Sequence, residues 1–287
     1  MHQAIRQGGV ALVTGAAVGI GHAITARLAK EGMDLVLVDR DSESLREATC
    51  RIRREYPQLQ VRAVTGNVTS QAIQQDACKA AEELGDLSLV VNNAAILEGG
   101  GPWEKVERWR ELMEINFWAI LSLQQLVVPT LLNQGGSAAI VNVGSKEGIT
   151  TPPGNAAYAT SKAALRVLTE QLAHELRQSS ANRVTAHLLI PGYTFTPMNF
   201  PGTAMTSAKP TAPWSADQVV DRMIDGLCMG EFYIFCEDNE VTREMDQRRM
   251  QWSADDLILG RPALSRWHPA WKDEFDRYMR PVNRRKE

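Results

Sequence analysis

The feature that most constrains the fold is a glycine-rich turn near the N-terminus. Val10 to Thr14 is a β-branched, apolar run typical of a strand, and a G-x-x-x-G-x-G sequence follows it directly, from Gly15 to Gly21. An amphipathic segment then continues through Lys30. Glycines at such a turn let the backbone approach a pyrophosphate, and a helix N-terminus offers free N–H groups and the positive end of a dipole. The turn therefore predicts a dinucleotide site, although the glycines alone would also fit a tight loop.

Strand-like and helix-like segments alternate over most of the chain. The predicted strands are residues 10–14, 34–38, 60–64, 87–91, 138–143, 183–190 and 232–235. The predicted helices include residues 42–56, 70–84, 106–132, 155–177 and 215–226. This alternation predicts an α/β fold with a doubly wound parallel sheet. The 287 residues suffice for one large domain, and no Gly/Ser-rich linker marks a second.

Polar residues follow several predicted strands, where ligands of parallel sheets bind. Asn67 and Asn92 are two of them, and Asp39 comes about 20 residues after the glycine motif, where an acid can bind both adenosine ribose hydroxyls. Asp39 would repel a 2′-phosphate, whereas the neighbouring Arg40 could accept one. We therefore expect NAD as the cofactor, with NADP as the alternative.

A second cluster of chemical groups lies between residues 140 and 165. Ser145 follows a predicted strand, and Tyr158 and Lys162 are four residues apart on a predicted helix, so they share one face. A nearby ammonium favours the phenolate and moves the phenol pKa toward the working range of a general base. A Tyr-x-x-x-Lys pair is also common on helix surfaces, so its surroundings decide its meaning.

Asn116 lies within the apolar predicted helix 106–132, beside Ile115, Phe117 and Trp118. An amide on an apolar face needs a hydrogen-bonding partner. Neighbouring backbone or a functional site could each supply that partner, and the residue alone does not distinguish between them.

Composition excludes several classes of function. A net charge of −3 gives no basic field for nucleic acid or anionic membranes. The four cysteines are scattered without metal-ligand spacing, so we expect no metal and a reducing compartment. Neither a signal peptide nor an apolar run of about 18 residues is recognisable. These features predict a soluble, cytoplasmic protein with a small-molecule ligand.

Taken together, the motifs identify a resemblance. In order along the chain they are the glycine turn from Thr14 to Gly21, Asn92-Asn93-Ala94-Ala95, Asn116, Ser145, Tyr158-Ala159-Thr160-Ser161-Lys162, and Pro191-Gly192. The chain resembles the classical short-chain dehydrogenase/reductases over residues 10–235. The resemblance implies a Rossmann-like domain and a homo-oligomer, either a dimer or a tetramer.

The resemblance also implies roles for four catalytic residues. Tyr158 would give or take the substrate hydroxyl proton, while Lys162 would bind the nicotinamide ribose and lower the pKa of the tyrosine. Ser145 would hold the substrate oxygen. Asn116 would hold a water molecule that links the lysine to solvent.

The implied cofactor contacts are spread over the glycine turn, the strand ends and the catalytic helix. They are Gly15, Val18, Gly19, Ile20, Gly21, Asp39, Arg40, Asn67, Val68, Asn93, Ala94, Tyr158, Lys162, Pro191, Gly192, Thr194 and Thr196. Three positions depart from the family pattern: Asn67 replaces an aspartate, Ala95 a glycine, and Thr194 an aliphatic residue. None of these removes a catalytic group, so we expect altered cofactor affinity at most.

Substrate identity should depend on the variable loops. Residues 197–214 form a proline-containing segment without helical periodicity, which predicts a functional loop. The apolar candidates for the pocket are Ile96, Leu97, Trp103, Tyr193, Met198, Phe200, Met205 and Trp214. Lys146 and Glu147 could add polarity. They predict a bulky, largely apolar or aromatic secondary alcohol or ketone as substrate.

Two alternatives to an NAD-dependent alcohol dehydrogenase or ketone reductase stay open. One is an NADPH-dependent carbonyl reductase of the same family, and the other is a catalytically silent dinucleotide-sensing protein. Retention of both Tyr158 and Lys162 argues against the silent protein.

The C-terminal part exceeds what the fold needs. We expect residues 1–236 to form the catalytic domain and residues 237–287 to form an extension, packed on that domain or on a neighbouring subunit. The extension contains five large aromatic residues, Trp252, Trp267, Trp271, Phe275 and Tyr278. That much aromatic surface must be buried somewhere.

Overall fold

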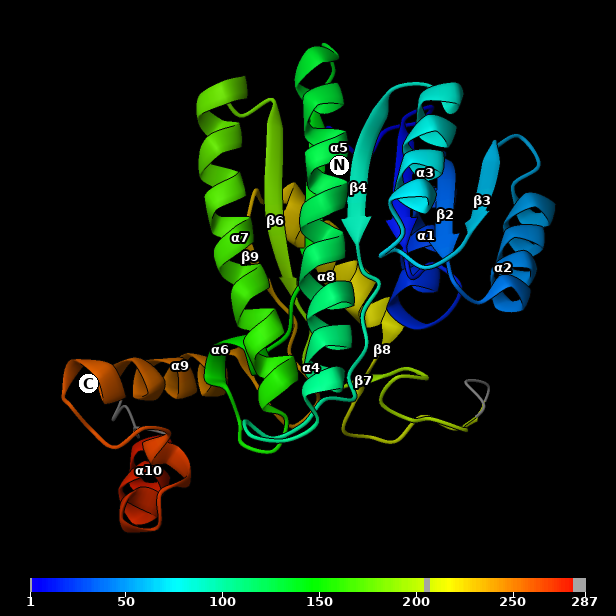
Figure 1. The fold of residues 1–287 in the computed structure, drawn as a ribbon. Helices are drawn as coiled ribbons and strands as arrows, with labels where there is room; N and C mark the ends of the chain where they lie inside the picture. The colour runs from blue at the N-terminus through cyan, green and yellow to red at the C-terminus, as the bar shows by residue number, and fades with distance from the viewer. Residues whose placement is uncertain (1, 204–206, 281–287) are drawn as a thin grey trace, which may run out of the picture.

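A seven-stranded parallel sheet forms the centre of the molecule. The computed structural model describes residues 2–203 and 207–280. The strands are β1 (Val10–Thr14), β2 (Asp34–Asp39), β3 (Val61–Thr65), β4 (Leu87–Asn92), β5 (Ala138–Val143), β6 (Val184–Ile190) and β9 (Tyr233–Phe235). Their order is β3-β2-β1-β4-β5-β6-β9, with every neighbouring pair parallel (Figure 1). This confirms the predicted α/β fold and its parallel sheet.

Helices cover both faces because the central strands are apolar on both. One face packs against α1 (Gly19–Lys30), α2 (Ser42–Glu55) and α8 (Ala216–Cys228). The other packs against α3 (Gln71–Leu84), α5 (Ala119–Asn133) and α7 (Ala156–Ser180). Alternate residues of β1 divide between the faces, with Ala11 and Val13 on the first and Leu12 on the second. The result is a doubly wound sheet.

The strand order reverses direction between β1 and β4. Chain connections run from β1 outward to β3, and then return to place β4 on the other side of β1. In doubly wound sheets the crevice beyond the carboxyl ends at this switch point is where ligands bind. The glycine turn and Asn93 lie there.

One predicted element differs in the structure. The expected single helix 106–132 is divided into α4 (Val106–Met113), a π-helical turn η1 (Glu114–Trp118) and α5. The π turn lies at Asn116, whose side chain bonds to backbone outside the helix. By length and composition the combined helix could cross a membrane, but its location within the domain makes this weak evidence.

Short elements join the loops at the carboxyl edge of the sheet. α6 (Glu147–Thr150) follows Ser145, and β7 (Thr194–Phe195) pairs with β8 (Trp214–Ser215) to enclose the loop between them. Ser215 caps α8 through a capping box with Gln218. Met205, a candidate pocket residue, lies outside the described residues.

The C-terminal extension forms a small helical unit beside the domain (Figure 1). It consists of α9 (Arg243–Ile258), the 3₁₀ turns η2 (Ser265–Trp267) and η3 (Pro269–Trp271), and α10 (Lys272–Met279). Trp252 is 1% exposed and has ring contacts with Trp271, Phe275 and Tyr278. The extension thus buries much of its aromatic surface within itself.

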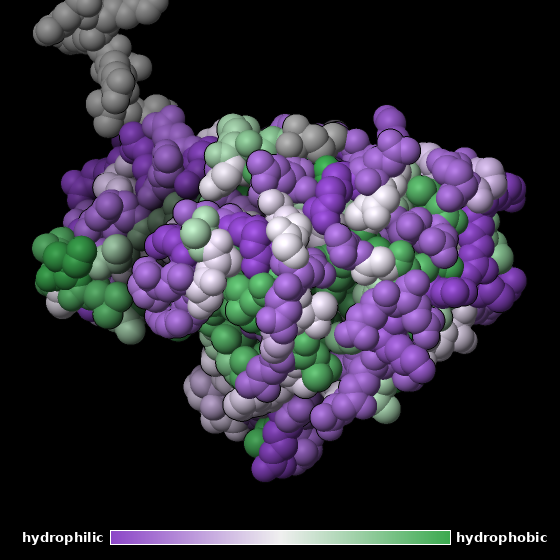
Figure 2. Space-filling view, turned by 90° about the horizontal axis from the view of Figure 1, so that it is seen from above, coloured by the Kyte–Doolittle hydropathy of each residue, from purple (hydrophilic) through white to green (hydrophobic). Residues whose placement is uncertain are grey.

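The outer surface is mainly polar on the face seen from above. Figure 2 shows hydrophilic side chains over most of this face and hydrophobic ones in smaller groups. The apolar side chains of the domain are instead gathered in the clusters on each side of the sheet.

Candidate active site

A cavity of about 490 Å³ lies at the carboxyl ends of the strands. It is within the size range of small-molecule and cofactor sites. The structure brings together on its wall Gly15, Val18, Gly19, Ile20, Asp39, Arg40, Asn67, Val68, Asn93, Ala94, Ser145, Tyr158, Lys162, Pro191, Gly192, Thr194 and Thr196. Gly21 and Asn116 are the two predicted site residues that do not line it.

Two glycines of the turn, Gly15 and Gly21, leave no room for a side chain. Gly15 has φ +64°, and a Cβ there would lie 2.8 Å from the Cα of Ala94. A Cβ on Gly21 would lie 1.9 Å from the carbonyl oxygen of Gly15. Gly21 therefore acts through close packing of α1 on the turn, whereas Gly15 borders the cavity itself.

The N-terminus of α1 faces this turn. No side chain in the described part of the chain caps it, and the N-cap residue is Val18. Free N–H groups, the helix dipole and a backbone surface without side chains are what a pyrophosphate requires. The residues present thus fit a dinucleotide phosphate.

Asn93 links the ends of β1 and β4, the two strands that border the crevice, through hydrogen bonds. Its Nδ2 donates to the carbonyl oxygens of Thr14 and Gly15 at 3.0 and 2.9 Å. In return, the Thr14 hydroxyl oxygen accepts from the backbone N–H groups of Asn93 and Ala94, both at 3.1 Å. These bonds fix the glycine turn relative to the end of β4.

Asp39 lies at the end of β2 with its carboxylate at the cavity wall. One oxygen accepts from the Ala17 backbone N–H at 3.0 Å, and the other from the Asp41 N–H at 3.0 Å. A carboxylate has further acceptor capacity after two such bonds. Arg40 is exposed beside it on the same wall. Both groups proposed to discriminate between the cofactors are thus at one end of the cavity.

Asn67 and Thr194, two departures from the family pattern, both use their side chains locally. The Asn67 carbonyl oxygen accepts from the Thr69 backbone N–H at 3.1 Å, and the Thr194 hydroxyl donates to the Gly192 carbonyl oxygen at 3.1 Å. The amide oxygen of Asn67 has a second lone pair for a ligand.

The catalytic candidates come from two neighbouring segments. Ser145 follows β5, and the first turns of α7 carry Tyr158 and Lys162. Asn155 caps α7, since its side chain accepts from the Tyr158 N–H at 3.4 Å and donates to the Leu97 carbonyl oxygen at 2.7 Å. Lys162 Nζ lies 5.8 Å from the centre of the Tyr158 ring. The two side chains therefore lie close together near the start of α7, and an effect of the ammonium on the phenol stays a prediction.

Burial is the largest influence on the pKa values of Tyr158 and Lys162. Tyr158 is 8% exposed and Lys162 is 2% exposed. Burial raises the pKa of Tyr158 to about 12, although a hydrogen bond with Ser145 acts in the opposite direction. Burial also lowers the pKa of Lys162 to about 7, and its ammonium donates to the Val143 carbonyl oxygen at 2.8 Å. The tyrosine pKa thus shifts opposite to the direction expected from its lysine neighbour, because desolvation of the phenolate prevails.

Asn116 lies behind the cavity wall and is fully buried. Its side chain accepts from the Ile96 N–H and donates to the Ile96 carbonyl oxygen, both at 2.9 Å, and it also reaches Ser161 Oγ at 3.2 Å. These partners satisfy the amide and connect the loop after β4 to α7. Its expected role toward a water molecule stays a prediction.

The substrate candidates divide into two groups. Ile96, Leu97, Tyr193 and Met198 line the cavity, as do Lys146 and Glu147. Trp103, Phe200 and Trp214 do not: Trp103 is 84% exposed, Phe200 contacts the Tyr193 and Phe195 rings, and Trp214 packs on the core. The mixed pattern of the loops gave no basis for this division.

Several lining residues were not predicted. Gly66, Val143 and Gly144 follow or end strands, so the rule that ligands bind beyond strand ends could have identified them. Ile115 and Asn199 also line the cavity, but no motif marks them. Within residues 2–203 and 207–280, no group of three metal-ligating side chains is present.

Comparisons with known proteins agree with this geometry. Residues 9–206 match the model of the short chain dehydrogenase family. The 1-deoxy-11-beta-hydroxypentalenate dehydrogenase of Streptomyces exfoliatus is 33% identical over 261 residues, which cover 90% of this chain and 93% of the relative.

Solved structures share the architecture. A short chain dehydrogenase/reductase from Burkholderia phymatum in complex with NAD has a TM-score of 0.79 and 27% identity, covering 91% of this chain and 97% of that one. A short-chain dehydrogenase from Sphingobium yanoikuyae in complex with NADPH has a TM-score of 0.71 and 26% identity, covering 88% and 95%. The fold, the cavity and these matches together show that the chain belongs to the short-chain dehydrogenase family.

Proposed function

We propose that the protein transfers a hydride between NAD(H) and a bulky, largely apolar secondary alcohol or ketone, with Tyr158 as general acid and base. The observation that carries this proposal is the placement of Ser145, Tyr158 and Lys162 on the wall of the same cavity as the glycine turn. Proton transfer and dinucleotide binding can then occur side by side.

The chain's own residues account for the proton chemistry. When bound, the nicotinamide would accept or supply the hydride, and its positive oxidised form favours the Tyr158 phenolate. The Tyr158 oxygen takes the proton of an alcohol during oxidation and returns it during reduction. Ser145 donates a hydrogen bond to the substrate oxygen, and Lys162 holds the ribose and stabilises the phenolate.

Asp39 supports a preference for NAD over NADP. A carboxylate at the cavity wall can bind ribose hydroxyls and repels a 2′-phosphate. Arg40 is the specific observation in favour of the second candidate, an NADPH-dependent carbonyl reductase, since this basic residue lines the same wall. A silent dinucleotide-sensing protein would not need the buried pair of Tyr158 and Lys162.

We expect Asp39→Ala to narrow the preference for NAD over NADP by about tenfold or more, because a repulsive charge is removed. The ratio of kcat/KM values with the two cofactors measures this effect. Glu43→Ala, which removes an exposed carboxylate from the first turn of α2, is the control. An unchanged ratio in Asp39→Ala would show that Asp39 does not face the ribose.

The cavity wall supports a bulky substrate. Ile96, Leu97, Tyr193 and Met198 provide an apolar surface, with Lys146 and Glu147 as polar exceptions. The Streptomyces exfoliatus relative is named for the dehydrogenation of a hydroxypentalenate, and the proposed oxidation of an alcohol agrees with that name.

A substrate screen tests the function directly. NADH or NADPH absorbance is followed with a panel of secondary alcohols and aryl ketones of increasing size, with each cofactor. We expect turnover of bulky compounds with NAD(H) and little turnover of 2-propanol or acetone. Activity with NADPH alone would support the second candidate, and cofactor binding without any turnover would support the silent protein.

The same proposal extends to organisation. Residues 1–236, including the loop 197–214, would form the catalytic domain, and residues 237–287 an extension of it. We also propose that the protein is cytoplasmic and that it forms a homo-oligomer, either a dimer or a tetramer. Sedimentation velocity measures the size of the assembly.

A further inference from the structure

The C-terminal extension docks on the domain through α9. Met250 of α9 and Ile149 of α6 both pack against a buried cluster formed by Leu188, Ile190 and Phe235 at the ends of β6 and β9. The Arg243 guanidinium also lies 4.0 Å from the centre of the Phe235 ring. α9 therefore packs against the short helix that follows Ser145.

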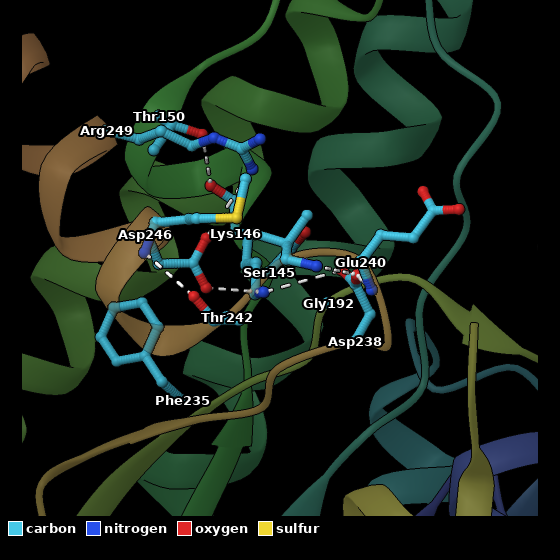
Figure 3. Close-up of polar contacts among 12 residues, drawn as sticks. Ser145, Lys146, Thr150, Gly192, Phe235, Asp238, Glu240, Thr242, Asp246 and Arg249 are labelled. Atoms are coloured by element: carbon cyan, nitrogen blue, oxygen red, sulfur yellow. Dashed lines mark hydrogen bonds and ion pairs between the residues drawn. The ribbon is translucent and has the colours of Figure 1, made fainter. Parts of the chain in front are cut away.

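An ionic cluster lies at the centre of this contact. Lys146 Nζ is 2.6 Å from Asp246 Oδ2 and 3.8 Å from Asp238 Oδ2, both in the extension. The three side chains are 16%, 5% and 8% exposed, respectively. Figure 3 shows the Lys146 ammonium between the two carboxylates. Arg249 lies 4.0 Å from the second Asp246 oxygen.

Because the cluster is buried, each of its charged side chains depends on an oppositely charged neighbour. A charged group removed from water needs an opposite charge, and removal of one partner leaves the other uncompensated. The extension supplies both carboxylates, while the domain supplies the ammonium. Within the extension, Arg249 lies 4.0 Å from Asp246, so the Lys146 ammonium of the domain, at 2.6 Å, is the nearer partner of this carboxylate.

The cluster touches two segments of the cavity wall. Lys146 directly follows Ser145 in the chain, and its backbone N–H donates to the Pro191 carbonyl oxygen at 3.3 Å. At Gly192, an added Cβ would lie 3.0 Å from Lys146 Nζ and 3.2 Å from Asp238 Oδ2. The side chains of the cluster thus rest against the Pro191-Gly192 segment as well as the Ser145 segment.

The peptide unit between Lys146 and Glu147 is hydrogen-bonded both to α6 and to the serine hydroxyl. The Lys146 carbonyl oxygen accepts from the backbone N–H groups of Ile149 and Thr150 at 3.1 and 3.0 Å, which closes α6. The Glu147 N–H then donates to Ser145 Oγ at 3.1 Å. A displacement of Lys146 would therefore move the turn that orients Ser145.

We propose that Lys146, Asp238 and Asp246 are positioning residues through which the C-terminal extension holds Ser145 and Pro191-Gly192 in place for catalysis. None of the described extension residues lines the cavity, so the effect acts through Lys146. The inference rests on the proposed function, in which Ser145 holds the substrate oxygen.

Asp246→Asn tests the proposal on the full chain. Its matched control is Glu244→Gln, which removes a carboxylate from the same helix. The Glu244 side chain is 71% exposed and lies 3.5 Å from Arg248, one turn further along α9. Hydrogen–deuterium exchange of the backbone amides of residues 145–150 and of Gly192 and Tyr193 is measured without substrate. Values of kcat and KM follow with the substrate from the screen, together with NADH affinity.

We expect Asp246→Asn to accelerate exchange in both segments about tenfold and to lower kcat about tenfold, with NADH affinity changed less than about threefold. Glu244→Gln should match the parent protein in every measurement. Lys146→Met should reproduce the result, and Lys146→Arg should recover part of kcat because it retains the charge.

Two outcomes would overturn the inference. One is unchanged exchange in residues 145–150 in both Asp246→Asn and Lys146→Met. The other is faster exchange with unchanged kcat, which would reduce the cluster to a structural contact. If the screen finds no turnover, the proposed function fails. The exchange rates, which are measured without substrate, still show whether the extension holds residues 145–150 in place.

Discussion

Replacement of Tyr158 by phenylalanine is expected to lower kcat about 10³-fold while NADH binds with nearly unchanged affinity. The variant loses one hydroxyl, the group that gives and takes the substrate proton, and keeps the ring that packs against Leu112 and Ala157. Steady-state kinetics in both directions measure the loss. Fluorescence titration with NADH measures cofactor affinity.

Tyr233→Phe is the matched control for this variant. Its phenol also donates a hydrogen bond, to Glu170 at 2.7 Å, but it lies on β9 outside the cavity wall. We expect its kcat to stay within about twofold of the parent value. Near-normal turnover by Tyr158→Phe would instead exclude Tyr158 as the proton carrier, whatever Tyr233→Phe does.

The sheet and most of the cavity were predictable because strand periodicity and strand ends are local signals. Each predicted strand of the sheet is present, with boundaries that differ by one residue or fewer. Residues at strand ends, such as Asp39 and Ser145, reach one cavity because parallel strands place their carboxyl ends at the same edge. Sequence spacing is sufficient for that inference.

Features that depend on distant contacts could not be predicted in the same way. The π turn at Glu114–Trp118 forms where Asn116 bonds to Ile96, a loop residue 20 positions away. The raised pKa of Tyr158 follows from the burial of its side chain, which only the packed structure sets. Lys146 appeared as a polar pocket residue, and its carboxylate partners lie 92 and 100 positions later in the chain.

The same distinction separates Gly15 from Gly21. Both belong to one motif and were assigned one role, contact with the cofactor. In the structure Gly15 borders the cavity, whereas Gly21 faces the carbonyl oxygen of Gly15 and the Asn93 amide. A motif gives the residue type at each position, and the packing gives the reason for it.

Gly21→Ala is therefore expected to disrupt the site through its backbone. The new Cβ would lie 1.9 Å from the Gly15 carbonyl oxygen and 2.6 Å from Asn93 Nδ2, so α1 must move away from the turn. We expect the free energy of unfolding to fall by about 3 kcal/mol and the Tm by roughly 10 °C. NADH affinity should fall about 100-fold, because α1 no longer presents its N-terminus to the pyrophosphate. Thermal unfolding and NADH titration measure these effects.

Gly135→Ala provides the control, because a Cβ there would have no atom of the described residues within 4 Å. Its Tm should stay within about 2 °C of the parent protein and its NADH affinity should be unchanged. Since neither position has a positive φ, the two substitutions differ in the space available to one methyl group. If Gly21→Ala retained full NADH affinity, the approach of α1 to the turn would not determine the shape of the pyrophosphate site. A large loss of NADH affinity in Gly21→Ala but not in Gly135→Ala would show that close packing of the Gly21 backbone on the Gly15 backbone shapes this part of the site.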